Sequence, residues 1–223
     1  MHQRKGKKIF IYLFLLLIVG SINNTALTKI EFKNIKNIEI SGLDESENTD
    51  LLKNIDDLNL DNIFFINRNK ISKIINSNSL VESYEIFKKY PHTVDIKIKK
   101  TNFLAKMNIN DKLFLIGSNG KLIDVKFLDT EVPFIFGKPQ IDEFIQFTNI
   151  IGKSNFSLSQ IKNLYFFPSK RWDLELKNNI ILKLSKNHTR LSLDQAFKFL
   201  NDNNFKDIKV VDARIKNQII LND

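Results

Sequence analysis

Hydrophobic residues near the N-terminus form one continuous run. Residues from Ile9 to Ile22 are all apolar or small, and four basic residues precede them: Arg4, Lys5, Lys7 and Lys8. Such a run predicts a transmembrane anchor at 9–27, following a basic cytoplasmic tail at 1–8. The uninterrupted run covers roughly 21 Å, which is less than the ~30 Å hydrocarbon core, so a cleaved signal peptide stays open as the alternative. The residues expected to contact the membrane in this anchor include Ile9, Leu13, Leu16 and Val19.

A short connector at 28–37 leads from this run to a first compact unit at 38–100. Ile38 to Gly42 predicts a short strand, and apolar residues at helical spacing predict two helices, over 46–58 and after Asn67. Two strands follow at 81–88 and 94–99, joined by a turn that contains Pro91. The expected order is therefore β, α, α, β, β.

The remainder, 101–223, alternates strand-like and helix-like segments, so the chain as a whole is expected to be α+β. Residues 172–178 and 180–184 predict a hairpin, because the Asn178-Asn179 pair tolerates the positive φ of a tight turn. Thr189 can cap a helix, and a last strand is expected from Ile208 to Leu221.

Composition and charge change this picture little. The chain has 223 residues, 43% of them hydrophobic, which is enough to bury one or two modest cores. Four of its 34 basic residues precede the apolar run, so the rest carries a charge of only about +5. Lys alternates with Asp and Glu, which favours a solvated mixed surface over a nucleic-acid site. The absence of Cys excludes disulfides and thiolate chemistry.

No set of residues predicts catalysis or ligand binding. The seven glycines are scattered and cannot build a phosphate-binding loop. His2, His92 and His188 are isolated, and neighbouring Asp142 and Glu143 suit the start of a helix. We therefore expect no enzyme activity, cofactor, metal or small-molecule substrate.

Several segments together resemble the bacterial cell-division family FtsQ/DivIB. They include Arg171-Trp172 before an alternating strand, Val211-Asp212-Ala213-Arg214 near the C-terminus, and the apolar segment from Val132 to Gly137. The strand pair around Pro91 also matches. The resemblance implies a single N-terminal transmembrane helix, a POTRA domain at 38–100 and a C-terminal mixed β-sheet domain with packed helices at 101–223.

The resemblance further implies a scaffold of the division septum in the inner membrane, with its C-terminal bulk in the periplasm. Its partners would be the single-pass division proteins FtsB and FtsL, bound where a terminal strand leaves a sheet edge free. Other division proteins would contact the POTRA domain. The expected partner-binding residues are Arg171, Trp172, Arg214, Ile215 and Ile219.

Alternatives stay open on the residues alone. Trp172, the only Trp, could instead be a core aromatic. Arg171 and Arg214 could be ordinary surface cations. The chain could instead be a secreted enzyme, a polyanion-binding protein, or a POTRA chaperone of outer-membrane barrel assembly.

Overall fold

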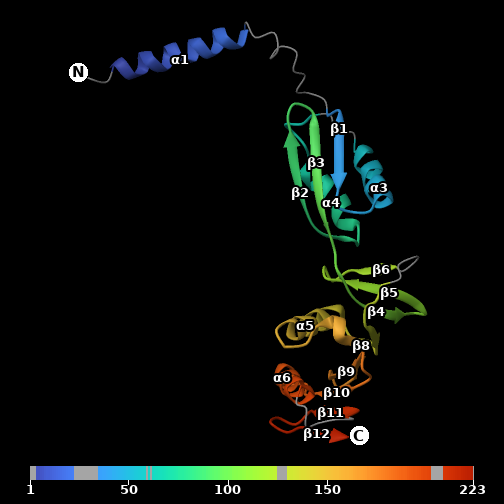
Figure 1. Cartoon of the computed structure of the whole chain (residues 1–223). Helices are drawn as coiled ribbons and strands as arrows, with labels where there is room; N and C mark the ends of the chain where they lie inside the picture. Colours follow the sequence, from blue (N-terminus) through green and yellow to red (C-terminus); the bar gives the residue numbers. More distant parts are fainter. Residues whose placement is uncertain are drawn as a thin grey trace. The chain divides into compact units, whose positions relative to one another are not determined.

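The computed structural model describes residues 4–22, 35–58, 60, 62–124, 130–201 and 208–222 (Figure 1). The chain divides into two compact units. Unit 1 comprises Met1–Ser77 and Tyr84–Lys99, and unit 2 comprises Asn78–Ser83 and Lys100–Asp223. Both units mix helices with strands, so the predicted α+β class is confirmed.

Helix α1 (Arg4–Ile22) contains the apolar run. Within the part of the chain that the structure describes, no helix combines the length and the apolar character needed to cross a membrane. The transmembrane helix predicted at 9–27 is therefore not found. The reason is that basic residues take up the start of this 19-residue helix, which leaves fewer than the ~20 apolar residues of a typical span. Residues 23–27 lie outside the described residues.

Unit 1 has the predicted order of elements. The strands are β1 (Asn37–Ser41), β2 (Val81–Lys89) and β3 (Thr93–Lys100), and the helices are α3 (Glu45–Asp56) and α4 (Arg68–Ser77). The sheet order is β1-β3-β2, and β1 pairs in parallel with β3. This leaves β1 and β2 as the two edges of the sheet.

The amphipathic pattern of α3 and α4 explains their packing. Leu51 and Ile55 on α3 and Ile71 and Ile75 on α4 are buried, whereas the charged residues of both helices remain exposed. Gly42 ends β1 with φ +111°, and a Cβ there would lie 1.7 Å from the carbonyl oxygen of Ile98. Only glycine can make this turn.

Unit 2 contains one nine-stranded sheet with the strand order β12-β11-β10-β9-β8-β7-β4-β5-β6. Its strands are β4 (Phe103–Ile109), β5 (Lys112–Gly117), β6 (Leu122–Asp124), β7 (Phe134–Phe136), β8 (Ile161–Phe166), β9 (Trp172–Leu176), β10 (Ile181–Leu184), β11 (Val210–Ala213) and β12 (Ile220–Asn222). Helices α5 (Ile141–Gly152) and α6 (Thr189–Leu200) and the short 3-10 helix η1 (Leu158–Gln160) complete the unit. The predicted hairpin is confirmed as β9 and β10, which pair antiparallel, with Asn179 at φ 64° in the turn.

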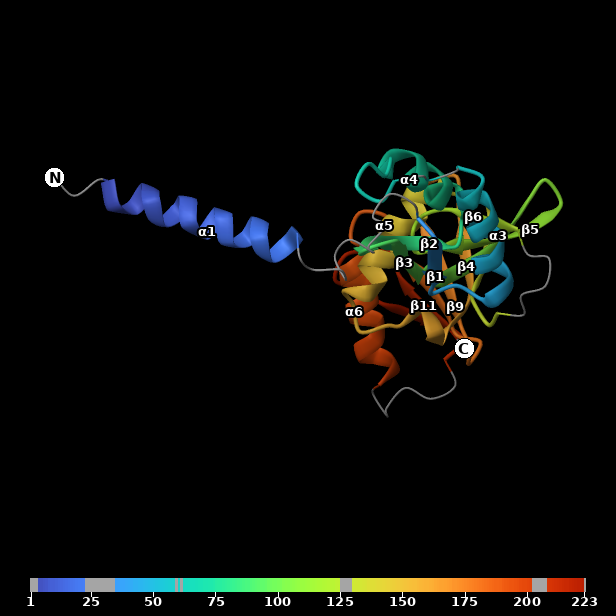
Figure 2. The same cartoon turned by 90° about the horizontal axis from the view of Figure 1, so that it is seen from above.

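Both long helices of unit 2 cover the same face of the sheet. In the two views, α5 and α6 lie on one side of β9 and β11 (Figure 1; Figure 2). Phe144 and Phe147 of α5 and Leu193 of α6 join Leu174 and Val211 of the sheet in one buried cluster. The opposite face of β8 to β12 carries the side chains that alternate with this core.

The C-terminal strand differs from the prediction. The single strand expected from Ile208 to Leu221 is two strands, β11 and β12, which form an antiparallel pair with Asp212 opposite Ile220. The chain reverses between them, and Asn217 adopts φ 62° in the connection. Helix α6 also begins one residue earlier than a Thr189 cap requires, because His188 is its N-cap, while the Thr189 hydroxyl donates to the Ser185 carbonyl at 2.9 Å.

Candidate partner-binding site

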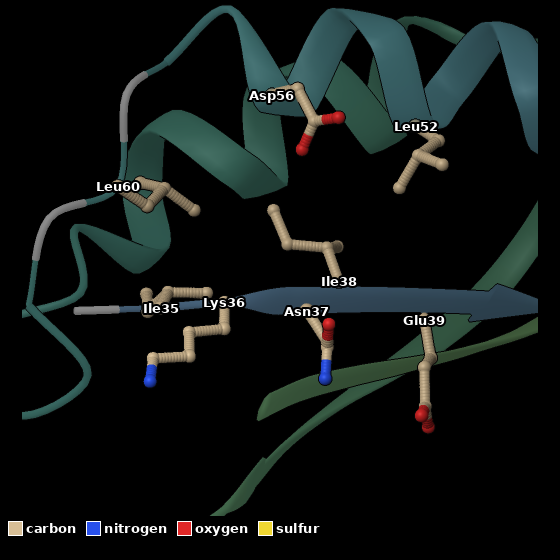
Figure 3. Close-up of a pocket in the computed structure, with 8 residues that line it drawn as sticks. All are labelled: Ile35, Lys36, Asn37, Ile38, Glu39, Leu52, Asp56 and Leu60. Atoms are coloured by element: carbon tan, nitrogen blue, oxygen red, sulfur yellow. The ribbon is translucent and has the colours of Figure 1, made fainter. Parts of the chain in front are cut away.

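The described residues hold no group of three or more His, Cys, Asp or Glu side chains that could bind a metal ion. A hollow of about 650 Å³ lies beside the edge strand β1 in unit 1 (Figure 3). Ile38 of β1 points toward Leu52 and Asp56 of α3, whereas Asn37 and Glu39 point to the other face of the strand (Figure 3). The described residues that line the hollow include Lys36 and Asp56 as charged groups and Leu52 and Leu60 as apolar ones.

A row of side chains crosses the helix-free face of the C-terminal sheet. The strand register places Tyr165, Asp173, Lys183, Asp212 and Ile220 opposite one another on β8 to β12. Residues paired in this way project to the same side of a sheet. The neighbouring row, which includes Leu174 and Val211, is fully buried against the helices. The polar row therefore lies on the face opposite the helices, where acidic and basic side chains alternate and where Asp173 and Asp212 are themselves buried.

Arg171 and Arg214 lie on the same side of this row, at matching ends of their strands. Arg171 precedes β9 and Arg214 follows β11, and these ends coincide because β9 runs antiparallel to β10 while β10 runs parallel to β11. With two strand spacings between them, their backbones are about 10 Å apart. The structure thus brings together two predicted residues that are far apart in the sequence.

Each arginine binds an aspartate of the row. Arg171 donates from Nε to Asp173 Oδ1 at 3.1 Å, and its guanidinium lies 4.3 Å from the centre of the Phe167 ring. Arg214 donates from Nε to both Asp212 oxygens, at 2.8 and 2.9 Å. These hydrogen bonds lower the pKa of Asp212 and raise that of Arg214. Arg214 remains 47% exposed, so it can accept a further anionic partner.

The three other predicted residues occupy different environments. Trp172 is buried and stacks on Phe147, with ring centres 4.5 Å apart. This is the place expected of a core aromatic, from which it supports Arg171 and Asp173 on either side. Ile219 is partly buried against the core, whereas Ile215 is 54% exposed beside Arg214. Ile220, which the sequence analysis did not select, is 50% exposed on β12.

A second feature of the open face was also missed. Glu175 accepts hydrogen bonds from Asn163 at 2.8 Å, Tyr165 at 2.7 Å and Lys162 at 2.9 Å. These bonds, with that of Asn163 contributing most, lower the pKa of Glu175 from 4.5 to about 2, and the Glu175 side chain is only 15% exposed. The alternation of polar residues in β8 and β9 is visible in the sequence, but their convergence depends on the strand register.

Next to Glu175, aromatic rings continue the open face. Phe136 stacks on Tyr165 with ring centres 5.1 Å apart and also contacts Phe134 at 4.7 Å. Phe136 remains 46% exposed. The aromatic rings and Glu175 give this part of the sheet a rigid surface.

Strand β12 completes the site as the outermost strand of the described sheet. One side of β12 pairs with β11, and no described strand pairs with the other side. An edge of this kind offers backbone N–H and C=O groups to an incoming strand, and Ile220 and Arg214 supply apolar and cationic contacts beside it.

Comparisons with known proteins identify the family. Residues 33–100 match the family model described as "POTRA domain, FtsQ-type". The chain is 25% identical over 205 residues to the cell division protein FtsQ of Rickettsia bellii, which covers 86% of this chain and 72% of that protein. It is 30% identical over 102 residues to the cell division protein DivIB of Clostridium acetobutylicum, covering 46% and 41%. These matches support the resemblance of the chain to the FtsQ/DivIB family.

Both relatives are named as bacterial cell division proteins. A solved structure of the same family, the major extracytoplasmic domain of the trans isomer of DivIB from Geobacillus stearothermophilus, aligns with a TM-score of 0.36 at 15% identity. It covers 48% of this chain and 99% of that one. The resemblance noted in the sequence is supported by the family model and by the FtsQ and DivIB relatives.

Proposed function

We propose that this FtsQ/DivIB protein is a non-enzymatic scaffold that binds FtsB-like and FtsL-like single-pass division proteins at the septum. The partner segment adds a strand to the free side of β12. Its apolar residues contact Ile220, and an acidic residue pairs with Arg214. POTRA contacts to other division proteins would make the chain a link between two groups of partners.

The single observation that carries this proposal is the edge of β12 with which no described strand pairs. Half-exposed Ile220 lies on this strand, and the half-exposed Arg214 guanidinium follows the neighbouring strand β11. Main-chain hydrogen bonds supply affinity in strand addition, whereas neighbouring side chains supply selectivity. The proposed surface also needs no titratable dyad or nucleophile, which agrees with a binding role.

We further propose that α1 attaches the protein to the inner membrane, with both units on the periplasmic face. Ile9, Leu13, Leu16 and Val19 are between 55% and 73% exposed, and their spacing places them along one side of this helix. Burying such side chains in lipid is favourable by ~25 cal/mol for each Å² removed from water. Extraction of membranes with carbonate tests the attachment, since a peripheral or secreted protein would be released.

Co-purification of the full chain with FtsB and FtsL of the same organism tests the partner proposal. Ile220→Asp should abolish recovery of the partners, because a charge on the edge strand opposes pairing and removes the apolar contact. Leu122→Asp is the matched control, since Leu122 is 37% exposed on β6 at the other edge of the same sheet. Equal loss of the partners in both variants, or in neither, would contradict the assignment to β12.

A further inference from the structure

Three aromatic side chains gather on the surface of unit 1. Phe64, Phe65 and Tyr90 are 50%, 85% and 55% exposed, respectively, and the rings of Phe64 and Tyr90 lie 5.4 Å apart. Phe65 is more exposed than any other large hydrophobic residue that the structure describes. We call Phe64, Phe65 and Tyr90 the aromatic end of unit 1. Exposed apolar groups of this size commonly mark a contact surface.

The loop that carries Phe64 and Phe65 is held from both sides. Ile63 is fully buried in the core of unit 1. The backbone N–H of Phe64 donates to Asn62 Oδ1 at 2.9 Å, and Lys88 Nζ on β2 donates to the Phe64 carbonyl at 3.0 Å. The exposure of Phe65 therefore results from a defined loop rather than from a loose chain end.

The aromatic end lies where the chain arrives from α1. Tyr90 begins the turn between β2 and β3, and the carbonyl of His92 in this turn accepts a hydrogen bond from Lys36 N at 2.9 Å. Lys36 immediately precedes β1. About a dozen residues separate Ile22 from Ile35, so the chain can span at most ~45 Å between α1 and this end.

Basic residues surround the aromatic end. Arg68 and Lys70 are exposed in the first turn of α4, which contains no acidic residue, and Lys36 is exposed beside β1. These three residues and Lys88 outnumber the exposed acidic residues nearby, which are Glu39 on β1 and Asp56 and Asp57 at the end of α3. Exposed aromatic rings next to Lys and Arg suit the headgroup region of an anionic bilayer.

We propose that the aromatic end docks unit 1 on the surface of an anionic membrane, with Phe65 inserted among the lipid headgroups and Arg68 and Lys70 paired with lipid phosphates. This inference rests on the proposed attachment of α1, which would hold the aromatic end within reach of the bilayer. Docking would restrict the orientation of unit 1 relative to the membrane.

The test places a fluorescent label at single positions of the full chain, which contains no natural cysteine. Phe65→Cys reports on the aromatic end, Leu16→Cys on α1, and Ser46→Cys on the exposed first turn of α3 at the opposite end of β1. Each labelled variant is incorporated into vesicles of phosphatidylglycerol and phosphatidylcholine that carry brominated acyl chains. Fluorescence quenching then measures the proximity of each label to lipid.

We expect quenching at positions 65 and 16 but not at 46, and loss of quenching at 65 in Arg68→Glu/Lys70→Glu protein. Quenching at 16 without quenching at 65 would overturn the inference and leave the attachment of α1 intact. An absence of quenching at both positions would overturn both proposals. Unchanged quenching at 65 in the charge-reversed protein would overturn the role of the basic residues.

Discussion

Arg214 lies two residues after Asp212, and its Nε donates to both carboxylate oxygens of that aspartate, at 2.8 and 2.9 Å. The aspartate fixes the direction of the guanidinium, whose remaining surface is open to solvent. A pre-oriented cation loses less side-chain entropy when it binds an acidic partner.

Arg214→Ala should therefore weaken binding of the FtsB-like and FtsL-like partners by about tenfold or more, the loss expected for one charge-assisted hydrogen bond. Titration calorimetry of the co-purified components would measure this change. Arg190→Ala is the matched control, because Arg190 is an exposed arginine paired with Asp194 on α6. An equal effect of both substitutions would indicate a general charge effect instead of a contact at Arg214.

Asp212→Asn should weaken binding less than Arg214→Ala. The substitution retains the shape of the side chain but removes the charge that holds the guanidinium, so Arg214 would still be present in a less fixed orientation. Salt titration of partner binding should show a similar salt dependence for Asp212→Asn and the wild type. Tighter binding by Asp212→Asn would mean that the aspartate competes with the partner for Arg214.

Proline substitutions can identify which backbone groups of β12 face outward. Successive residues of an edge strand direct their N–H groups alternately toward the neighbour and toward solvent. Of Ile220→Pro and Leu221→Pro, one should therefore destabilise the protein, and the other should block the partner while leaving the free energy of unfolding nearly unchanged. Full partner binding by both variants would contradict strand addition at β12.

Glu175 should make the stability of the protein depend on acidic pH. Its pKa is depressed to about 2 in the folded protein, so the stabilisation is fully present above pH 4.5 and is lost as pH falls toward 2. Glu175→Gln should cost on the order of 2–3 kcal/mol in the free energy of unfolding at pH 7 and little near pH 2. Denaturant titrations that follow Trp172 fluorescence at several pH values would measure this difference. Glu131→Gln, at a 95% exposed side chain, should have almost no effect at either pH.

Gly42 and Gly137 offer a test of the two units. Gly137 has φ +102°, and a Cβ there would lie 2.3 Å from the Phe166 carbonyl oxygen. Gly137→Ala should strain unit 2, and Gly42→Ala should strain unit 1, each by several kcal/mol. Calorimetry should then show a separate transition moving in each variant. A common shift of all transitions would contradict independent folding of the units.

The sequence predicted the elements of unit 1 because each has a local cause. The spacing of Ile71 and Ile75 marks one face of a helix, and the alternation after Val94 marks a half-buried strand. The hairpin at Asn178 and Asn179 was equally local, since a two-residue turn needs only residues that accept positive φ.

Predictions that depended on more than local pattern were less accurate. The residues from Val211 to Lys216 alternate in hydrophobicity, yet the chain reverses after Ala213 because β12 gains hydrogen bonds by pairing with β11. The apolar run of α1 is similarly visible in the sequence, but among the described residues its helix does not combine the length and apolar character needed to cross a membrane.

By itself, the sequence predicted the α+β class, the resemblance to the FtsQ/DivIB family, and the two arginines proposed for the candidate partner-binding site. Only the tertiary structure placed Arg171 and Arg214 at the same end of the sheet, buried Trp172, exposed Ile220 and gathered three donors around Glu175. The reason is physical. Periodicity along a chain specifies which face of an element is apolar, whereas strand order and register, which arise from packing between distant segments, decide which polar side chains meet.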